Sequence, residues 1–133
     1  MSVVTEHKLL PSELRLVEQK LYDYRINKSL TKEYLAQREE LARNIKQRKP
    51  RDPMTVQLLL LEEKARREQF WLEAIEDVME RLPEEDRRLI ELKYLGTTLP
   101  NTEVAAELHI SDSELYRRNQ RILQRFAQRF GMI

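Results

Sequence analysis

The sequence predicts an all-α protein, and three observations lead to that prediction. The 133-residue chain contains only two glycines, 35% of its residues are charged, and strong helix formers occupy most positions. Its apolar residues recur at spacings of three and four. The chain has no cysteine, which excludes disulfides and cysteine zinc sites. We expect an N-terminal helical hairpin over residues 1–51, a long connecting helix over 52–81 and a C-terminal helix-turn-helix domain over 82–133.

Two helices are predicted for the N-terminal hairpin, which we expect to serve interaction or oligomerisation. The first begins at Pro11 and extends to about Asn27, with an apolar stripe of Leu14, Val17, Leu21 and Tyr24. The segment Asn27-Lys28-Ser29 is predicted to be a turn. The second helix extends from about Thr31 to Gln47, and its inner face comprises Tyr34, Leu35, Leu41, Ala42 and Ile45. The two helices are expected to pack antiparallel.

The segment "RKPRDPMT" separates this hairpin from the long helix. Asp52 is predicted to be the N-cap and Pro53 the first helical residue. The end of the hairpin is basic, and its basic residues either contact a DNA backbone or belong to a solvated linker: Lys46, Arg48, Lys49 and Arg51. The helix extends to about Leu82, or roughly 45 Å. The helix has more apolar surface than one partner face needs. It therefore either bridges the hairpin and the C-terminal part or pairs with another copy of the chain.

Three shorter helices are predicted after the long one. Pro83 begins the first, which places acidic residues at the positive end of the helix dipole, and Gly96 ends it. Asn101 is predicted to cap a short helix that ends at Leu108. The last helix extends to about Arg129, and its start is a capping box formed by Ser111 and Glu114.

The last two helices have the spacing of a helix-turn-helix unit. Such a unit requires a small residue where its helices touch, and Ala105 is that residue. Its apolar positions are filled by Val104, Leu108, Ile110 and Leu115. His109 stands in the turn where glycine is usual, and histidine tolerates the left-handed conformation better than most residues. Arg118 stands at a position that is commonly apolar, so the inner face must continue through other residues, namely Ile122 and Phe126, with Asn119 near the seam.

The helix that begins after Ser111 carries the residues expected to read DNA. Such a helix contacts base edges through side chains near its start, which here are Asp112, Ser113, Tyr116, Arg117 and Gln120. Arginine can bind guanine bidentately, and glutamine can bind adenine. The expected phosphate contacts are Arg118, Arg121 and Arg125. Residues 112–133 contain five arginines and two acidic residues, a balance that fits either a DNA contact or a solvated helix face.

The C-terminal half resembles a known DNA-binding domain. The segments "LPEEDRRLIELKYL" and "NTEVAAELHISDSELYRRNQRILQRF" resemble region four of bacterial sigma factors, which reads promoters. The chain as a whole resembles the RinA-type phage transcriptional activators, and the ArpU-type regulators, in its "HIS" turn, its "LQRFAQRFGM" end and its "DPMTVQLLL" segment. The resemblance implies a sigma-like helix-turn-helix domain and activation of late phage genes with RNA polymerase in a bacterial host.

The sequence leaves three functions open. The first is a DNA-binding activator of phage or prophage genes, and the second is a DNA-packaging recognition protein of the small-terminase type, which a stable ring of subunits favours. The third is a helical adaptor that binds RNA polymerase without reading DNA, and it predicts sequence-blind, salt-sensitive DNA binding. We expect no enzyme, cofactor or metal, because the sequence lacks a glycine-rich phosphate loop, a nucleophile elbow and a metal-ligand cluster. An apolar run of membrane-spanning length and a signal peptide are also lacking, so a cytoplasmic location is expected, with double-stranded DNA as the partner and a homodimer or higher oligomer open.

Overall fold

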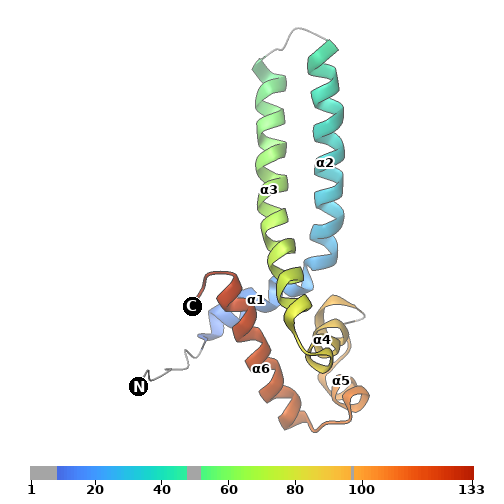
Figure 1. Cartoon of the computed structure of the whole chain (residues 1–133), viewed down its shortest axis with the longest axis vertical. Helices are drawn as coiled ribbons and strands as arrows, with labels where there is room; N and C mark the ends of the chain where they lie inside the picture. Colours follow the sequence, from blue (N-terminus) through green and yellow to red (C-terminus); the bar gives the residue numbers. More distant parts are fainter. Residues whose placement is uncertain (1–8, 48–51, 97) are drawn as a thin grey trace. The chain divides into compact units, whose positions relative to one another are not determined.

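A computed structural model of the chain describes residues 9–47, 52–96 and 98–133 (Figure 1). These residues form helices and no strand, which confirms the all-α prediction. In chain order the helices are α1 (Pro11–Tyr22), α2 (Tyr24–Gln47), α3 (Asp52–Arg81), α4 (Glu84–Ile90), the π-helical η1 (Glu91–Leu95), α5 (Asn101–Leu108) and α6 (Asp112–Arg129). None of the helices in these ranges combines the length and the apolar character that crossing a membrane requires.

The described residues divide into two compact units. The first unit combines the residues up to Asp23 with Ala74–Ile133, and the second unit is Tyr24–Glu73. The boundary expected between residues 51 and 52 therefore falls inside the second unit, and α3 contributes to both units. The second unit is an insertion between two segments of the first.

Helix α6 packs against several helices of the first unit. It contacts α1, α4 and α5. Its buried face comprises Leu115, Asn119, Ile122, Leu123, Phe126 and Ala127, which includes the two residues predicted to continue the inner face. The residues buried around it come from the other helices of the unit, among them Val17, Leu21, Leu89, Ile90, Tyr94 and Val104. A continuous apolar core therefore holds α6 by one side only.

The second unit is an antiparallel hairpin of α2 and the first part of α3 (Figure 1). The Lys64 ammonium lies 5.9 Å from the centre of the Tyr34 ring, a contact that joins the two helices. Most inner-face residues of the hairpin are only half-buried, including Leu35, Leu41, Ile45, Leu58 and Leu61. A pair of helices cannot enclose its apolar residues as the first unit does.

The predicted turn at Asn27-Lys28-Ser29 is wrong. Helix α2 is continuous through this segment, and the Thr31 hydroxyl donates a hydrogen bond to the Asn27 carbonyl oxygen at 2.8 Å inside it. The segment contains neither glycine nor proline, so nothing in it prevents helical hydrogen bonding. The first helix ends at Asp23 instead, whose N–H donates to the Gln19 carbonyl oxygen at 2.9 Å. Consequently the partner of α2 within its unit is α3, whereas α1 packs on α6 and η1.

Two predicted helix starts also differ in detail. Helix α3 begins at Asp52 itself, and the preceding basic residues Arg48, Lys49 and Arg51 lie outside the described residues. The N-cap of α5 is Pro100 rather than Asn101, because the Pro100 carbonyl oxygen accepts the N–H groups of Glu103 and Val104, each at 3.0 Å.

Gly96 ends η1 as predicted, but for a different reason. Its φ of −105° is not left-handed, and its N–H donates to the Glu91 carbonyl oxygen at 2.7 Å, which makes the turn π-helical. A Cβ at this position would lie 2.8 Å from the same oxygen, so the close approach of two backbone segments requires glycine.

Candidate nucleic-acid interface

The connection between α5 and α6 is a tight turn centred on His109. This residue is left-handed, with φ 57° and ψ 42°. Its N–H donates to the Ala106 carbonyl oxygen at 3.2 Å, and the Ile110 N–H donates to the Ala105 carbonyl oxygen at 3.0 Å, which together make a Schellman motif. The side chains on either side of the turn that pack inward are buried, namely Val104, Ala105 and Leu115. The turn therefore ends α5 sharply at Leu108, and α6 begins four residues later at Asp112.

Ser111 caps α6. Its Oγ accepts the Glu114 N–H at 3.1 Å, which is one half of the predicted capping box. The Glu114 carboxylate, which the prediction paired with the Ser111 N–H, instead accepts Arg118 Nε at 2.8 Å and also binds the Arg117 guanidinium. The hydrogen bond from Arg118, followed by that from Arg117, holds the pKa of Glu114 below its ordinary value.

Arg118 links α6 to α4 through ion pairs and is not an unpaired cation. Besides Glu114 it binds Glu85 of α4, with Nη1 3.3 Å from the carboxylate oxygen, and its side chain is only 25% exposed. The hydrogen bond with Glu114 raises the pKa of Arg118 above its ordinary value. This arrangement explains how an arginine occupies a position that is commonly apolar. It also engages Nε and Nη1 with carboxylates of the same chain, which leaves fewer N–H groups for the phosphate contact expected for it.

The outward side of α6 presents most of the residues expected to contact bases. Asp112, Ser113 and Arg117 are exposed, Tyr116 is 68% exposed, and Gln120 is half-buried. From Ser113 onward they recur at spacings of three and one; Ser113 and Arg117 lie opposite Leu115 and Ile122, while Tyr116 and Gln120 lie at the border of the buried face. Hydroxyl, phenol, guanidinium and amide groups thus share one solvent-facing surface, which we name the α6 outer face: Asp112, Ser113, Tyr116, Arg117, Gln120 and Arg121.

The five arginines of α6 fall into two groups. Arg117 and Arg118 bind Glu114, and Arg129 Nε lies 3.0 Å from Asp77 Oδ2. Within residues 9–47, 52–96 and 98–133, no carboxylate pairs with Arg121 or Arg125. Both are exposed, so these two guanidinium groups are available to an anion.

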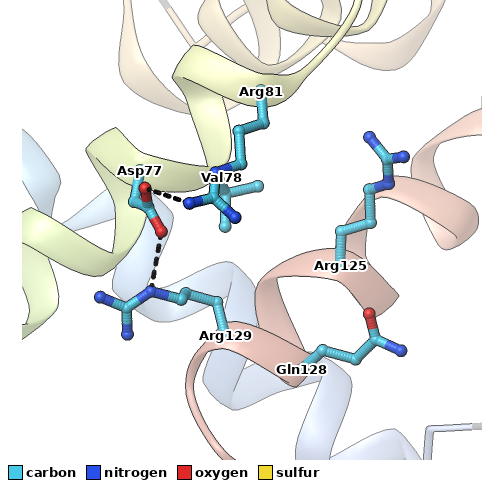
Figure 2. Close-up of a pocket in the computed structure, with 6 residues that line it drawn as sticks. All are labelled: Asp77, Val78, Arg81, Arg125, Gln128 and Arg129. Carbon is cyan, nitrogen blue, oxygen red and sulfur yellow. Dashed lines mark hydrogen bonds and ion pairs between the residues drawn. The ribbon is translucent and has the colours of Figure 1, made fainter.

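Arg125 borders a basic cleft in the first unit (Figure 2). The cleft has a volume of about 370 Å³ and is lined by Asp77, Val78, Arg81, Arg125, Gln128 and Arg129. Asp77 binds Arg129 and also Arg81, whose Nη2 lies 3.4 Å from Oδ1, while Arg125 lies across the cleft from them. Three arginines and one aspartate line the cleft, and this net positive lining suits it to a phosphate. The sequence did not point to Arg81 or Arg129, because their contribution depends on α3 meeting α6.

A buried polar group fixes the rotation of α6 about its axis. The Tyr94 hydroxyl donates to Glu18 Oε2 at 2.8 Å and accepts from Asn119 Nδ2 at 2.9 Å. Burial raises the pKa of the Tyr94 phenol above its ordinary value, so the phenol stays neutral. The Tyr22 ring meets Tyr94 edge-on at 4.9 Å. Asn119 reaches the Tyr94 hydroxyl when α6 turns this side chain toward the core, and in that orientation Ser113 and Arg117 face solvent.

No family model, curated protein or solved structure matches the chain. In the ranges that the structure describes, no group of three or more histidine, aspartate or glutamate side chains is placed to hold a metal ion.

Proposed function

We propose that the chain is a sequence-specific DNA-binding transcriptional regulator that inserts the first half of α6 into the major groove. One observation carries the proposal: a capped helix that follows a tight left-handed turn buries one side and exposes hydrogen-bonding side chains on the other. Recognition helices of helix-turn-helix proteins read bases in this way.

The length of α6 supports a division of roles between its two halves. Arg117 and Arg125 are eight residues apart, which is about 12 Å along a helix. The major groove is also about 12 Å wide, so a helix that places Arg117 at a base edge places Arg125 near the bordering phosphates. Arg121 and Arg125 are the arginines of α6 that pair with no carboxylate among the described residues, and the cleft beside Arg125 adds Arg81. Arg118 is assigned to the structure of the domain and not to DNA.

Arg117 can leave its carboxylate for a base. Its pair with Glu114 spans one helical turn, and its side chain is 74% exposed. Exposed pairs of this kind contribute little free energy, whereas a bidentate contact with guanine discriminates by about 1–3 kcal/mol. Glu114 then keeps Arg118 as its partner.

The biological role that we propose is activation of phage or prophage promoters with RNA polymerase. It follows from the likeness of "LPEEDRRLIELKYL" and the segment after it to sigma region four and to RinA-type activators. Selection of sheared host and prophage DNA on the purified chain, at near-physiological salt, tests it. We expect a few discrete sites at the starts of gene clusters. Sites at a packaging locus would favour the small-terminase function, and uniform recovery of all fragments would contradict sequence-specific reading.

Two substitutions test the division of roles. Arg117→Ala is expected to relax specificity at one base and to cost about 1–3 kcal/mol at the selected site. Arg125→Ala is expected to weaken selected and random DNA equally and to reduce the salt slope by about 1. Exposed Arg15 on α1 supplies the control, since Arg15→Ala is expected to change neither quantity. Equal losses of specificity from Arg117→Ala and Arg125→Ala would refute the division.

A further inference from the structure

Helix α3 has two apolar faces, and only one of them has a partner in the described part of the hairpin. The inner face contains buried and half-buried residues, among them Leu58, Leu61, Ala65 and Leu72. The opposite side carries four exposed large side chains: Val56 (53%), Leu59 (59%), Leu60 (56%) and Phe70 (46%). Soluble proteins rarely leave such a series uncovered without a binding role.

The exposed side has a charged centre between apolar ends. Glu63 and Arg67 lie on it, and their side chains pair at 3.8 Å while remaining more than half exposed. Together with the four apolar residues they form the outer stripe of α3: Val56, Leu59, Leu60, Glu63, Arg67 and Phe70. Successive members recur at helical spacings of three and four, apart from the adjacent pair Leu59 and Leu60, so the stripe is straight enough for another helix to lie along it.

When two copies of the stripe lie antiparallel, complementary residues of the two copies face each other. Leu60 and Phe70 have position 65 as their midpoint, and so do Glu63 and Arg67. A two-fold axis beside position 65 would therefore bring Leu60 against Phe70 of a second copy, and Glu63 against Arg67 of that copy. A parallel arrangement would instead oppose Glu63 to Glu63 and Arg67 to Arg67, which like charges disfavour.

We propose that the outer stripe of α3 binds the same stripe of a second copy of this chain, antiparallel, with a two-fold axis beside position 65. The contact joins apolar ends around two reciprocal Glu63–Arg67 pairs. The inference goes beyond DNA binding and does not rest on it, because every residue of the stripe belongs to the hairpin unit.

The oligomeric state of the full chain is the first test. Sedimentation over a range of micromolar concentrations should show a monomer–dimer equilibrium. Phe70→Ala should raise the dimer dissociation constant about 30-fold or more, because it removes an aromatic anchor of the contact. Ile26→Ala, which shortens an exposed apolar residue of α2, should leave it unchanged. A monomer at all concentrations, a larger assembly or equal effects of the two substitutions would overturn the proposal.

A mixing experiment tests the charge pairing. Glu63→Arg and Arg67→Glu should each prevent dimer formation, since each opposes like charges across the axis. An equimolar mixture of the two variants should form a heterodimer, because each arginine then meets a glutamate. Loss of the pair within one helix cannot produce this rescue. Glu39→Arg and Arg43→Glu, with the same spacing on the exposed side of α2, should dimerise like the unaltered chain. Failure of the mixture to dimerise would overturn the proposed contact.

The absence of cysteine from the chain allows a test of direction. In the antiparallel dimer the two copies of position 60 lie about 15 Å apart along the helix. A disulfide requires Cα atoms within about 7 Å. Under mild oxidation Leu60→Cys alone should therefore remain uncrosslinked, whereas a mixture of Leu60→Cys with Phe70→Cys should yield a covalent dimer. Crosslinking of Leu60→Cys to itself would establish a parallel contact and overturn the proposal.

Discussion

The two units of the chain bury their apolar residues to different extents. In the first unit Leu123, Phe126, Leu89 and Val17 have no exposed surface. In the described part of the hairpin unit the buried positions are Thr31, Ala65 and Leu72, and the large side chains between its helices remain half-exposed. The first unit can therefore be stable through its own core, whereas the hairpin gains more from a partner than from its internal contacts.

Shortening a leucine should show this difference most strongly. Leu123→Ala is expected to reduce the free energy of unfolding by about 2–5 kcal/mol, because it leaves a cavity in a closed core. Leu60→Ala, at a side chain that is 56% exposed, is expected to change it by less than about 0.5 kcal/mol. Urea unfolding followed by circular dichroism, at a concentration where the chain is monomeric, measures both. Similar costs at the two positions would mean that the units do not differ in this respect.

Asn119 of the first unit and Asn44 of the hairpin unit offer a second comparison between the two units. Asn119→Ala removes the buried partner of the Tyr94 hydroxyl and is expected to cost about 1–3 kcal/mol. Asn44 is exposed on α2, so Asn44→Ala should have no cost and corrects for the change in helix propensity. Thermal unfolding of both variants gives the difference. A cost near zero at Asn119 would show that the apolar core holds α6 without this hydrogen bond.

Glycine should have opposite effects in the two segments that the sequence marked as turns. His109 is left-handed, so His109→Gly is expected to be neutral or to stabilise by up to about 1 kcal/mol. Lys28 lies within α2, so Lys28→Gly is expected to destabilise by about 1 kcal/mol. Melting temperatures of the two variants measure the effects. Destabilisation by His109→Gly would indicate that the imidazole makes a contact that outweighs backbone strain.

The smallest effect concerns the acid dependence of stability. Because the pKa of Glu114 is lowered in the folded chain, its contribution is complete above the unfolded pKa of about 4.3 and is lost as the pH falls through the folded value. Glu114→Gln should therefore show a shallower fall in melting temperature between neutral and acidic pH than the unaltered chain. The exposed Glu40 of α2 serves as the control, and Glu40→Gln should leave the slope unchanged. Identical slopes for all three proteins would contradict the role of the Arg118 hydrogen bond.

Local signals predicted the helix ends near the C-terminus well. Pro83, Gly96 and Ser111 act through their own backbone or their nearest neighbours, so their effects can be read from a few residues. The break after Asp23 carries no comparable signal. Asn27-Lys28-Ser29 resembled a turn by composition, but such residues are tolerated in a helix whose other positions favour it.

Long-range partners limited what could be predicted of the candidate site. The exposed positions of α6 follow from its periodicity, and the structure leaves them exposed. The pairing of Arg118 with Glu85, and of Tyr94 with Glu18, joins residues far apart in the sequence, so periodicity could not reveal either. The cleft around Arg125 was missed for the same reason, since Asp77 and Arg81 belong to α3.

The division of the first unit into two segments has a consequence for synthesis on the ribosome. Helix α1 is translated before the hairpin, but α6, on which it packs, follows only after residues 24–111. At 5–20 residues per second this interval lasts roughly 5 to 20 seconds. During that time the hairpin is complete while Val17 and Leu21 still lack their core. The part of the chain proposed to join two copies thus becomes available for assembly before the part proposed to read DNA exists.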